Sequence, residues 1–200
     1  MEEVVGRWWH DALVKFTTPA VSAATVRLDE VCTAIGLMFR AAGGSATVRL
    51  APASLQRTAA PSHWLYRLAS AGGRSPLPTC DPEVLALPDS LSVFDERALN
   101  HDLYLWLALL GAHRVPHPDW VLSNIFATKN ALSAFPGFVE RYEKLNAAHR
   151  LQRQAMRVSG RVLSRAEQTV RAALAGQWCP DTPGGVLPAD VAPVWLWVCG

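Results

Sequence analysis

This 200-residue sequence lacks several features that would place it in a functional class. Its four cysteines, Cys32, Cys80, Cys179 and Cys199, are widely spaced, and no two have the CxxC spacing of a zinc ribbon or a thioredoxin-like site. No apolar run approaches the roughly 20 residues that a helix needs to cross a bilayer. The opening MEEVVGRWWHDALVKF is acidic where a secretory signal is basic. These absences predict a cytoplasmic protein with reduced cysteines and no membrane span.

Catalytic signatures are missing as well. The sequence contains no G-x-S-x-G elbow, no P-loop and no G-x-G-x-x-G motif. His113 and His117 have HxxxH spacing, but the prolines on either side of His117 prevent the helix that would bring both imidazoles to one metal. "DSLS" at 89–92 resembles the start of a von Willebrand A metal-ion motif, yet Leu91 stands where a serine oxygen is needed. We therefore predict a protein that is not an enzyme, with no catalytic residue, metal or cofactor.

Charge is scarce, whereas large apolar side chains are plentiful. The formal net charge is +2, which is too small to indicate a nucleic-acid partner. Half of the residues are hydrophobic, and there are eight Trp and six Phe. This composition predicts one folded domain with a sizeable core.

Apolar residues recur at three- and four-residue steps along most of the chain, which is typical of amphipathic helices. The patterns, with their acidic starts, glycine ends and prolines, predict helices over about 2–16, 28–42, 95–112, 118–134, 137–156 and 164–175. Asp95 is the predicted N-cap of the third helix, Ser164 and Glu167 form a predicted capping box, and Cys32 falls on an apolar stripe as a small core residue.

The stretch "LYLWLALL" at 103–110 is the most apolar part of the sequence. It lies in the predicted helix that follows Asp95, and apolar residues occupy every side of that helix. A helix of this kind is covered by neighbours on all sides. We expect it at the centre of the fold.

The predicted fold class is mainly α: a multi-helix bundle with one or two short strand pairs in the 45–94 region and at the C-terminus. A short helix is expected within 61–72. Residues 1–176 form the predicted helical domain, and 177–200 form a Pro/Gly-rich tail leading to a further C-terminal domain that this chain does not contain. The tail ends in "VWLWV", which would be an aggregation hazard unless it is paired or covered.

Five arginines, at 150, 153, 157, 161 and 165, follow one another at steps of three or four. On a continuous helix they would form a basic stripe able to bind an acidic partner surface. Ser159-Gly160 and the capping box indicate a break, so a solvated helix face is the favoured interpretation. Partner binding by Arg150, Arg153 and Arg157 is the alternative.

Three phrases of the sequence carry a family resemblance: "LALPDSLSVFDERALNHDLYLWLALL" at 85–110, "FPGFVERYEKLNAAH" at 135–149 and "PVWLW" at 193–197. They resemble the amino-terminal part of NorD-type proteins, which are related to the CbbO proteins of Rubisco activation. Proteins of this family carry a von Willebrand A domain at the carboxyl end and work with a MoxR-type AAA+ ATPase. None of that domain's metal ligands can be transferred to this chain.

The resemblance implies a non-catalytic adaptor or scaffold domain that helps a MoxR-type ATPase to activate or mature a target enzyme such as nitric oxide reductase. One alternative is a small-molecule-binding helical domain with a pocket lined by Tyr104, Trp106 and Trp120. Another is a truncated product of a longer gene with no independent function.

Overall fold

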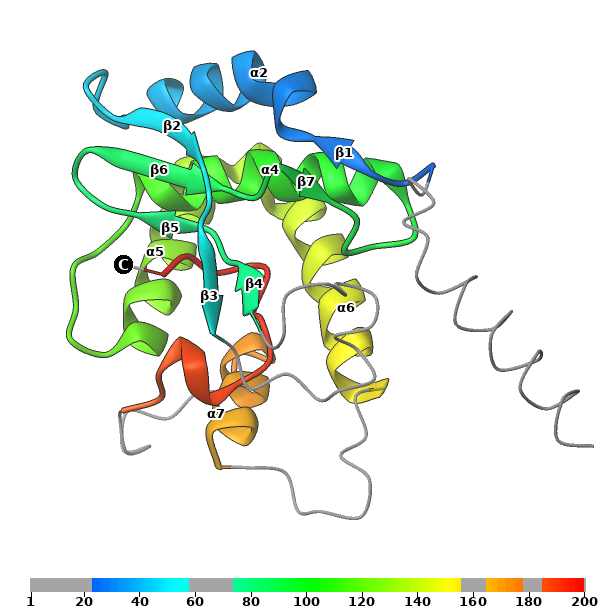
Figure 1. Cartoon of the computed structure of the whole chain (residues 1–200). Coiled ribbons are helices and arrows are strands. Elements are labelled where there is room, and N and C mark those ends of the chain that lie inside the picture. Colours follow the sequence, from blue (N-terminus) through cyan, green and yellow to red (C-terminus); the bar gives the residue numbers. More distant parts are fainter. Residues whose placement is uncertain (1–22, 58–73, 156–164, 178–184, 200) are drawn as a thin grey trace, which may run out of the picture.

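In the computed structural model, helices make up about half of the described residues. The structure describes residues 23–57, 74–155, 165–177 and 185–199 (Figure 1). Its helices are α2 (Leu28–Ala41), α4 (Arg97–Ala112), α5 (Trp120–Ala134), α6 (Val139–Ala155) and α7 (Arg165–Leu174), with short 3-10 turns at Pro136–Phe138 and Pro188–Asp190. The predicted mainly helical class is therefore confirmed. The predicted helices at 2–16 and 61–72 lie outside the described residues.

The strands are short and fall mainly in the region where strand pairs were predicted. β2 (Arg49–Pro52) runs parallel to β6 (Val84–Leu87), which also pairs antiparallel with β5 (Thr79–Cys80). Two further antiparallel pairs join β1 (Val26–Arg27) to β7 (Ser90–Leu91) and β3 (Leu55–Arg57) to β4 (Arg74–Pro76). In β6, Leu85 and Leu87 are buried and alternate with partly exposed residues, so one side of the strand faces the core.

Helix α2 follows the predicted stripe. Val31, Ile35 and Phe39 are buried, and acidic residues occupy the first turn, where they favour the helix dipole. Gly43 ends the helix with a φ of 88°, a conformation that a residue with a Cβ rarely adopts. The prediction for Cys32 was wrong, because its side chain is exposed rather than part of the core.

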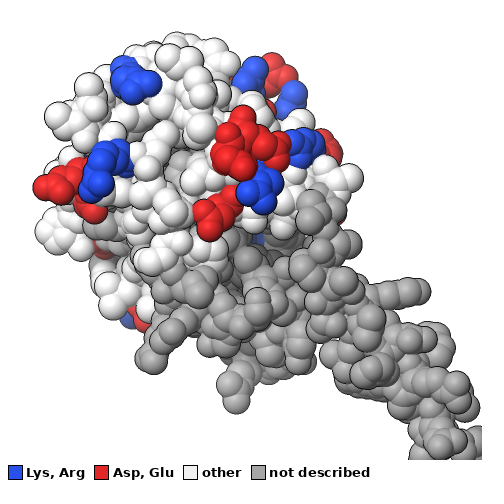
Figure 2. Space-filling model, turned by 45° about the horizontal axis from the view of Figure 1, so that its top comes forward, with Lys and Arg blue, Asp and Glu red and all other residues white. Residues whose placement is uncertain are grey.

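Exposed charges around α2 form ion pairs rather than a patch of one sign. Arg27 contacts Asp29 at 3.1 Å, and Arg97 contacts Glu30. Figure 2 shows the same mixture on one face of the molecule, where Lys and Arg lie beside Asp and Glu. Such exposed pairs contribute little to stability.

Helix α4 lies at the centre, as "LYLWLALL" predicted, and packs against α2, α5, α6 and β6. Leu103, Trp106 and Leu110 are fully buried, like most of the helix. Its N-cap is Glu96 instead of the predicted Asp95. Buried Asn100 replaces a side-chain cap, since its amide donates to the carbonyls of Phe94 and Ala24 and accepts from the Phe94 N–H. These bonds fix the loop that precedes the helix.

Helix α5 begins two residues later than its proline suggests. Asp119 is the N-cap and accepts a hydrogen bond from the Leu122 N–H at 3.0 Å, so Pro118 lies before the helix and not in its first turn. The end at Ala134 agrees with the prediction. None of the described helices has the length and apolarity that crossing a bilayer requires.

The C-terminal segment 191–199 is buried along its whole length. It forms no extended strand, and only Cys199 makes a parallel bridge, to Thr79. Polar side chains from the helices bind its backbone instead: the indole N–H groups of Trp106 and Trp120 donate to the carbonyls of Leu196 and Val198. The "VWLWV" run, which would favour aggregation if it were exposed, is therefore covered and forms part of the core.

Candidate interaction site between helices α6 and α7

The three arginines predicted to bind a partner occupy different environments. Arg150 is exposed on α6, whereas Arg153, on the same helix, is 1% exposed. Arg157 lies outside the described residues. A solvated helix face is therefore wrong for Arg153, and partner binding stays a prediction.

Arg153 is held by groups that are distant in the sequence. Its Nη1 donates to the Pro193 carbonyl at 2.9 Å and to the Ala192 carbonyl at 3.3 Å. Its Nη2 lies 2.6 Å from Glu167 Oε2, on helix α7. Burial lowers the pKa of the Arg153 guanidinium, and the Glu167 carboxylate opposes that shift. A buried ion pair of this kind ties α6, α7 and the C-terminal segment together.

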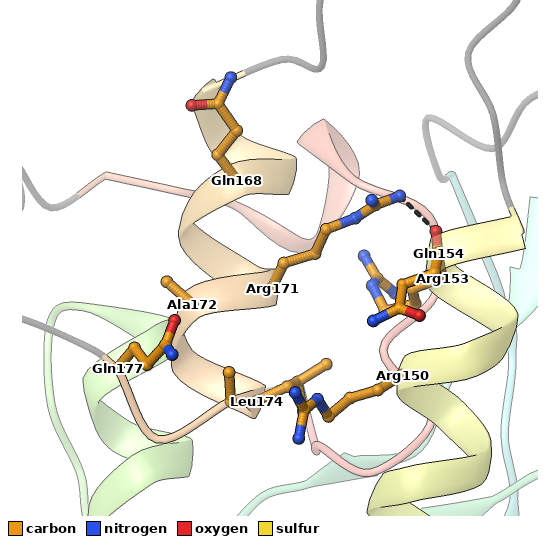
Figure 3. A pocket seen from close by; sticks show the side chains of 9 residues that line it. Arg150, Arg153, Gln154, Gln168, Arg171, Ala172, Leu174 and Gln177 are labelled. Atoms are coloured by element: carbon orange, nitrogen blue, oxygen red, sulfur yellow. Dashed lines mark hydrogen bonds between the residues drawn. The ribbon is translucent and has the colours of Figure 1, made fainter.

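Arg171 completes the network from α7. Its Nε lies 2.9 Å from Glu167 Oε1, and its Nη2 donates to the backbone carbonyl of Arg153, which Figure 3 marks with a dashed line. Glu167 was predicted to serve in a capping box with Ser164, which lies outside the described residues. Its carboxylate binds two guanidinium groups, one buried and one partly exposed.

A hollow of about 340 Å³ opens between α6 and α7 beside this network. Among the described residues, its polar lining consists of three arginines and three glutamines and includes no acidic side chain: Arg150, Arg153, Arg171, Gln154, Gln168 and Gln177. Figure 3 shows Arg150 and Arg171 reaching into the space from opposite helices. Such a lining presents hydrogen-bond donors and positive charge, which suit an anionic group.

His149 is a buried histidine one turn before Arg153. It is 2% exposed, its Nδ1 lies 3.4 Å from Gln152 Oε1, and its Nε2 has no hydrogen-bond partner in the described part of the chain. Burial and, secondarily, the Arg153 charge lower the pKa of His149 to about 3. The imidazole is therefore neutral near pH 7. Its helical spacing from Phe138, Tyr142 and Leu145 places it on the apolar face of α6, which is the signal of this burial in the sequence.

The aromatic residues proposed for a small-molecule pocket do not line the hollow. Tyr104 and Trp106 are fully buried, and the Tyr104 hydroxyl donates to the Pro88 carbonyl at 2.7 Å. Trp120 packs edge-on against Trp197. These rings belong to the core and to the attachment of the C-terminal segment.

Within the ranges that the structure describes, no three His, Cys, Asp or Glu side chains gather where they could hold a metal. His113 Nδ1 lies 3.0 Å from the Leu109 carbonyl, and His117 accepts a hydrogen bond from the Asp119 N–H. Ser90 and Leu91 of the "DSLS" stretch form β7 and pair with β1. Each of these groups thus has a local structural role.

Comparison with known proteins gives relatives of much greater length. The chain is 35% identical over 156 residues to an uncharacterized protein of Pseudomonas aeruginosa, and 36% identical over 174 residues to the protein NorD of Stutzerimonas stutzeri. It is 30% identical over 228 aligned positions to the protein NorD of Brucella abortus. These alignments cover 78%, 87% and 98% of this chain but 26%, 28% and 34% of the relatives.

No protein-family model matches the sequence, and no solved structure matches it either. The chain spans about a quarter to a third of the length of the curated relatives it matches. Two of these relatives, from different genera, carry the name NorD and align with nearly the whole chain. The chain therefore belongs to the NorD-type proteins.

Proposed function

We propose that this chain is a non-catalytic adaptor or scaffold region of a NorD-type accessory protein. It would act in the cytoplasm with a MoxR-type AAA+ ATPase, in the activation or maturation of a target enzyme such as nitric oxide reductase. The observation that carries the proposal is the alignment of 87–98% of the chain with proteins named NorD.

The described structure is compatible with an adaptor. Its buried polar groups serve the fold: Asn100 fixes the start of α4, Asn124 binds the backbone of Val198, and Arg153 joins three segments. Among the described residues that line the hollow between α6 and α7, none is a nucleophile or belongs to an acid–base pair. A surface of this chemistry suits recognition of another protein better than turnover of a substrate.

A capture experiment tests the ATPase partnership. The tagged 200-residue chain is incubated with a purified MoxR-type ATPase from the same genome, without nucleotide, with ADP and with a non-hydrolysable ATP analogue. We expect retention of the ATPase in at least one nucleotide state. An unrelated helical protein with the same tag is the control, and retention no greater than this control in all three states would contradict the partnership.

A cellular experiment tests the target. The coding region is deleted in the host, and nitric oxide consumption is measured beside the abundance of the nitric oxide reductase subunits. We expect consumption to fall while the subunits persist, and to return when the gene is supplied on a plasmid. Unchanged consumption would rule out this target without affecting the capture result.

A further inference from the structure

Arg153 is only partly satisfied by its intramolecular partners. Its two terminal nitrogens are bound to Glu167 and to the carbonyls of residues 192 and 193, but its Nε–H is buried and has no hydrogen-bond partner among the residues that the structure describes. A buried donor without a partner is costly and uncommon. Because Arg153 lines the hollow, an acceptor entering there is the natural partner for this group.

The charge of the hollow favours an anion. Three arginines line it, and the one acidic side chain in the network, Glu167, is shared between Arg153 and Arg171. Among the described residues, no carboxylate lies within ion-pair distance of Arg150. This differs from the face around α2, where exposed arginines are paired with neighbouring acids.

The shape of the hollow favours side chains of a protein partner. About 340 Å³ is at the small end of ligand pockets, and its rim includes the exposed residues Arg150, Gln154, Gln168 and Gln177. An open site of this size accommodates one or two side chains on a larger surface. Arginine forks and glutamine amides match the planar carboxylate of Glu or Asp.

We propose that the hollow between α6 and α7 is a docking site for the carboxylate side chains of an acidic segment on a partner protein. Arg153 is the preorganised element, because its guanidinium is already fixed by Glu167 and the C-terminal segment. Arg150 is the exposed contact that attracts the acidic segment. This inference deepens the proposed adaptor function, on which its biological meaning rests, by stating the chemistry of the partner.

The test uses the full chain and a fluorescein-labelled peptide of alternating Glu and Gly residues, followed by fluorescence anisotropy. The control peptide has Gln in place of every Glu. We expect saturable binding of the Glu peptide at low salt, weaker binding at higher ionic strength, and no binding of the Gln peptide. Equal binding of both peptides, or no binding of either, would overturn the proposal.

Variants locate the site. Arg150→Glu should weaken binding of the Glu peptide about tenfold or more, the factor expected when one charge-assisted hydrogen bond is lost. Arg141→Glu is the matched control, because Arg141 is an exposed arginine on the opposite side of α6 by the helical period. It should change binding less than twofold, roughly the effect of a distant surface charge. Equal weakening by both variants would mean general charge attraction and would overturn the site.

Gln154→Glu provides a second variant in case Arg150→Glu fails to fold. Gln154 is exposed at the rim, so a carboxylate there should repel the acidic peptide without disturbing the core. The capture experiment separates this inference from the proposed function. Capture of the ATPase by a chain that does not bind the Glu peptide leaves the function standing and removes the site. Specific binding of the Glu peptide without capture of the ATPase would support the site and contradict the ATPase partnership.

Discussion

His149 makes the stability of this protein depend on pH. Its imidazole is buried on α6, and burial lowers its pKa from the ordinary 6.5 to about 3. In the unfolded chain the imidazole takes up a proton as the pH falls below 6.5, whereas in the folded protein it does so only near pH 3. Unfolding therefore takes up protons in this window, and acid favours the unfolded state.

The magnitude follows from the two pKa values. Each pH unit between them costs about 1.4 kcal/mol, so lowering the pH from 7 to 5 should reduce the free energy of unfolding by about 2 kcal/mol through His149 alone. That is a considerable part of the stability of an ordinary domain, which is roughly 5–15 kcal/mol. The positive charge of Arg153, one helical turn away, adds to the cost of protonation.

The assay is urea unfolding followed by tryptophan fluorescence at pH 7, 6 and 5, for the wild type and for His149→Gln. The variant should lose less stability than the wild type on acidification, by about 2 kcal/mol at pH 5, because other titrating groups cancel in the comparison. His117→Gln, at an exposed position, is the control and should keep the pH dependence of the wild type. Parallel curves for His149→Gln and the wild type would refute the reasoning.

Three further changes test the core and the ion-pair network, each by thermal and urea unfolding. Glu167→Gln leaves the Arg153 charge buried without its partner and should cost about 3–5 kcal/mol, whereas the exposed Glu140→Gln should leave the melting temperature nearly unchanged. Trp106→Asp buries a charge in the centre of α4 and should prevent folding, so an unchanged melting temperature would contradict its placement. Asn124→Ala should cost about 1–3 kcal/mol, because the buried Val198 N–H loses its acceptor; a neutral effect would mean that another group binds it.

The helices could be predicted from the sequence because their signals are local. The apolar period, the acids in the first turn and the glycines after the last turn together placed α2 within a residue or two of its observed bounds. The same local signals placed α4 at the centre. Cys32 was misplaced because α2 packs mainly against α4, so only part of its apolar stripe is covered.

The position of the C-terminal segment could not be predicted, because what buries it is distant in the sequence. "VWLWV" has the composition of a strand, yet its backbone is bound by indole and amide groups from α4 and α5. The Asn124 side-chain amide donates to the Val198 carbonyl at 3.0 Å and accepts a hydrogen bond from the Val198 N–H at 2.9 Å. Side-chain pairing of this kind leaves no periodic pattern in the segment itself.

The arginine stripe shows the same limit at the candidate site. Arg150 and Arg153 belong to the same three- and four-residue repeat of arginines, and that repeat alone does not say which of the two is buried. The difference arises from Glu167 on α7 and from two carbonyls of the C-terminal segment, which together form a polar socket for Arg153 alone. A buried guanidinium requires such partners, and their convergence depends on the tertiary fold.

Arg153 both lines the hollow and holds the core together. The same guanidinium joins α6 to α7 and holds the backbone of residues 192 and 193, so its loss would change the core as well as the hollow. Glu167 and Arg171 are coupled to it through direct bonds. Arg150 and Gln154 lie outside these bonds and are exposed. Effects on recognition can therefore be separated from effects on stability at these two residues, whereas changes at the buried network will alter both together.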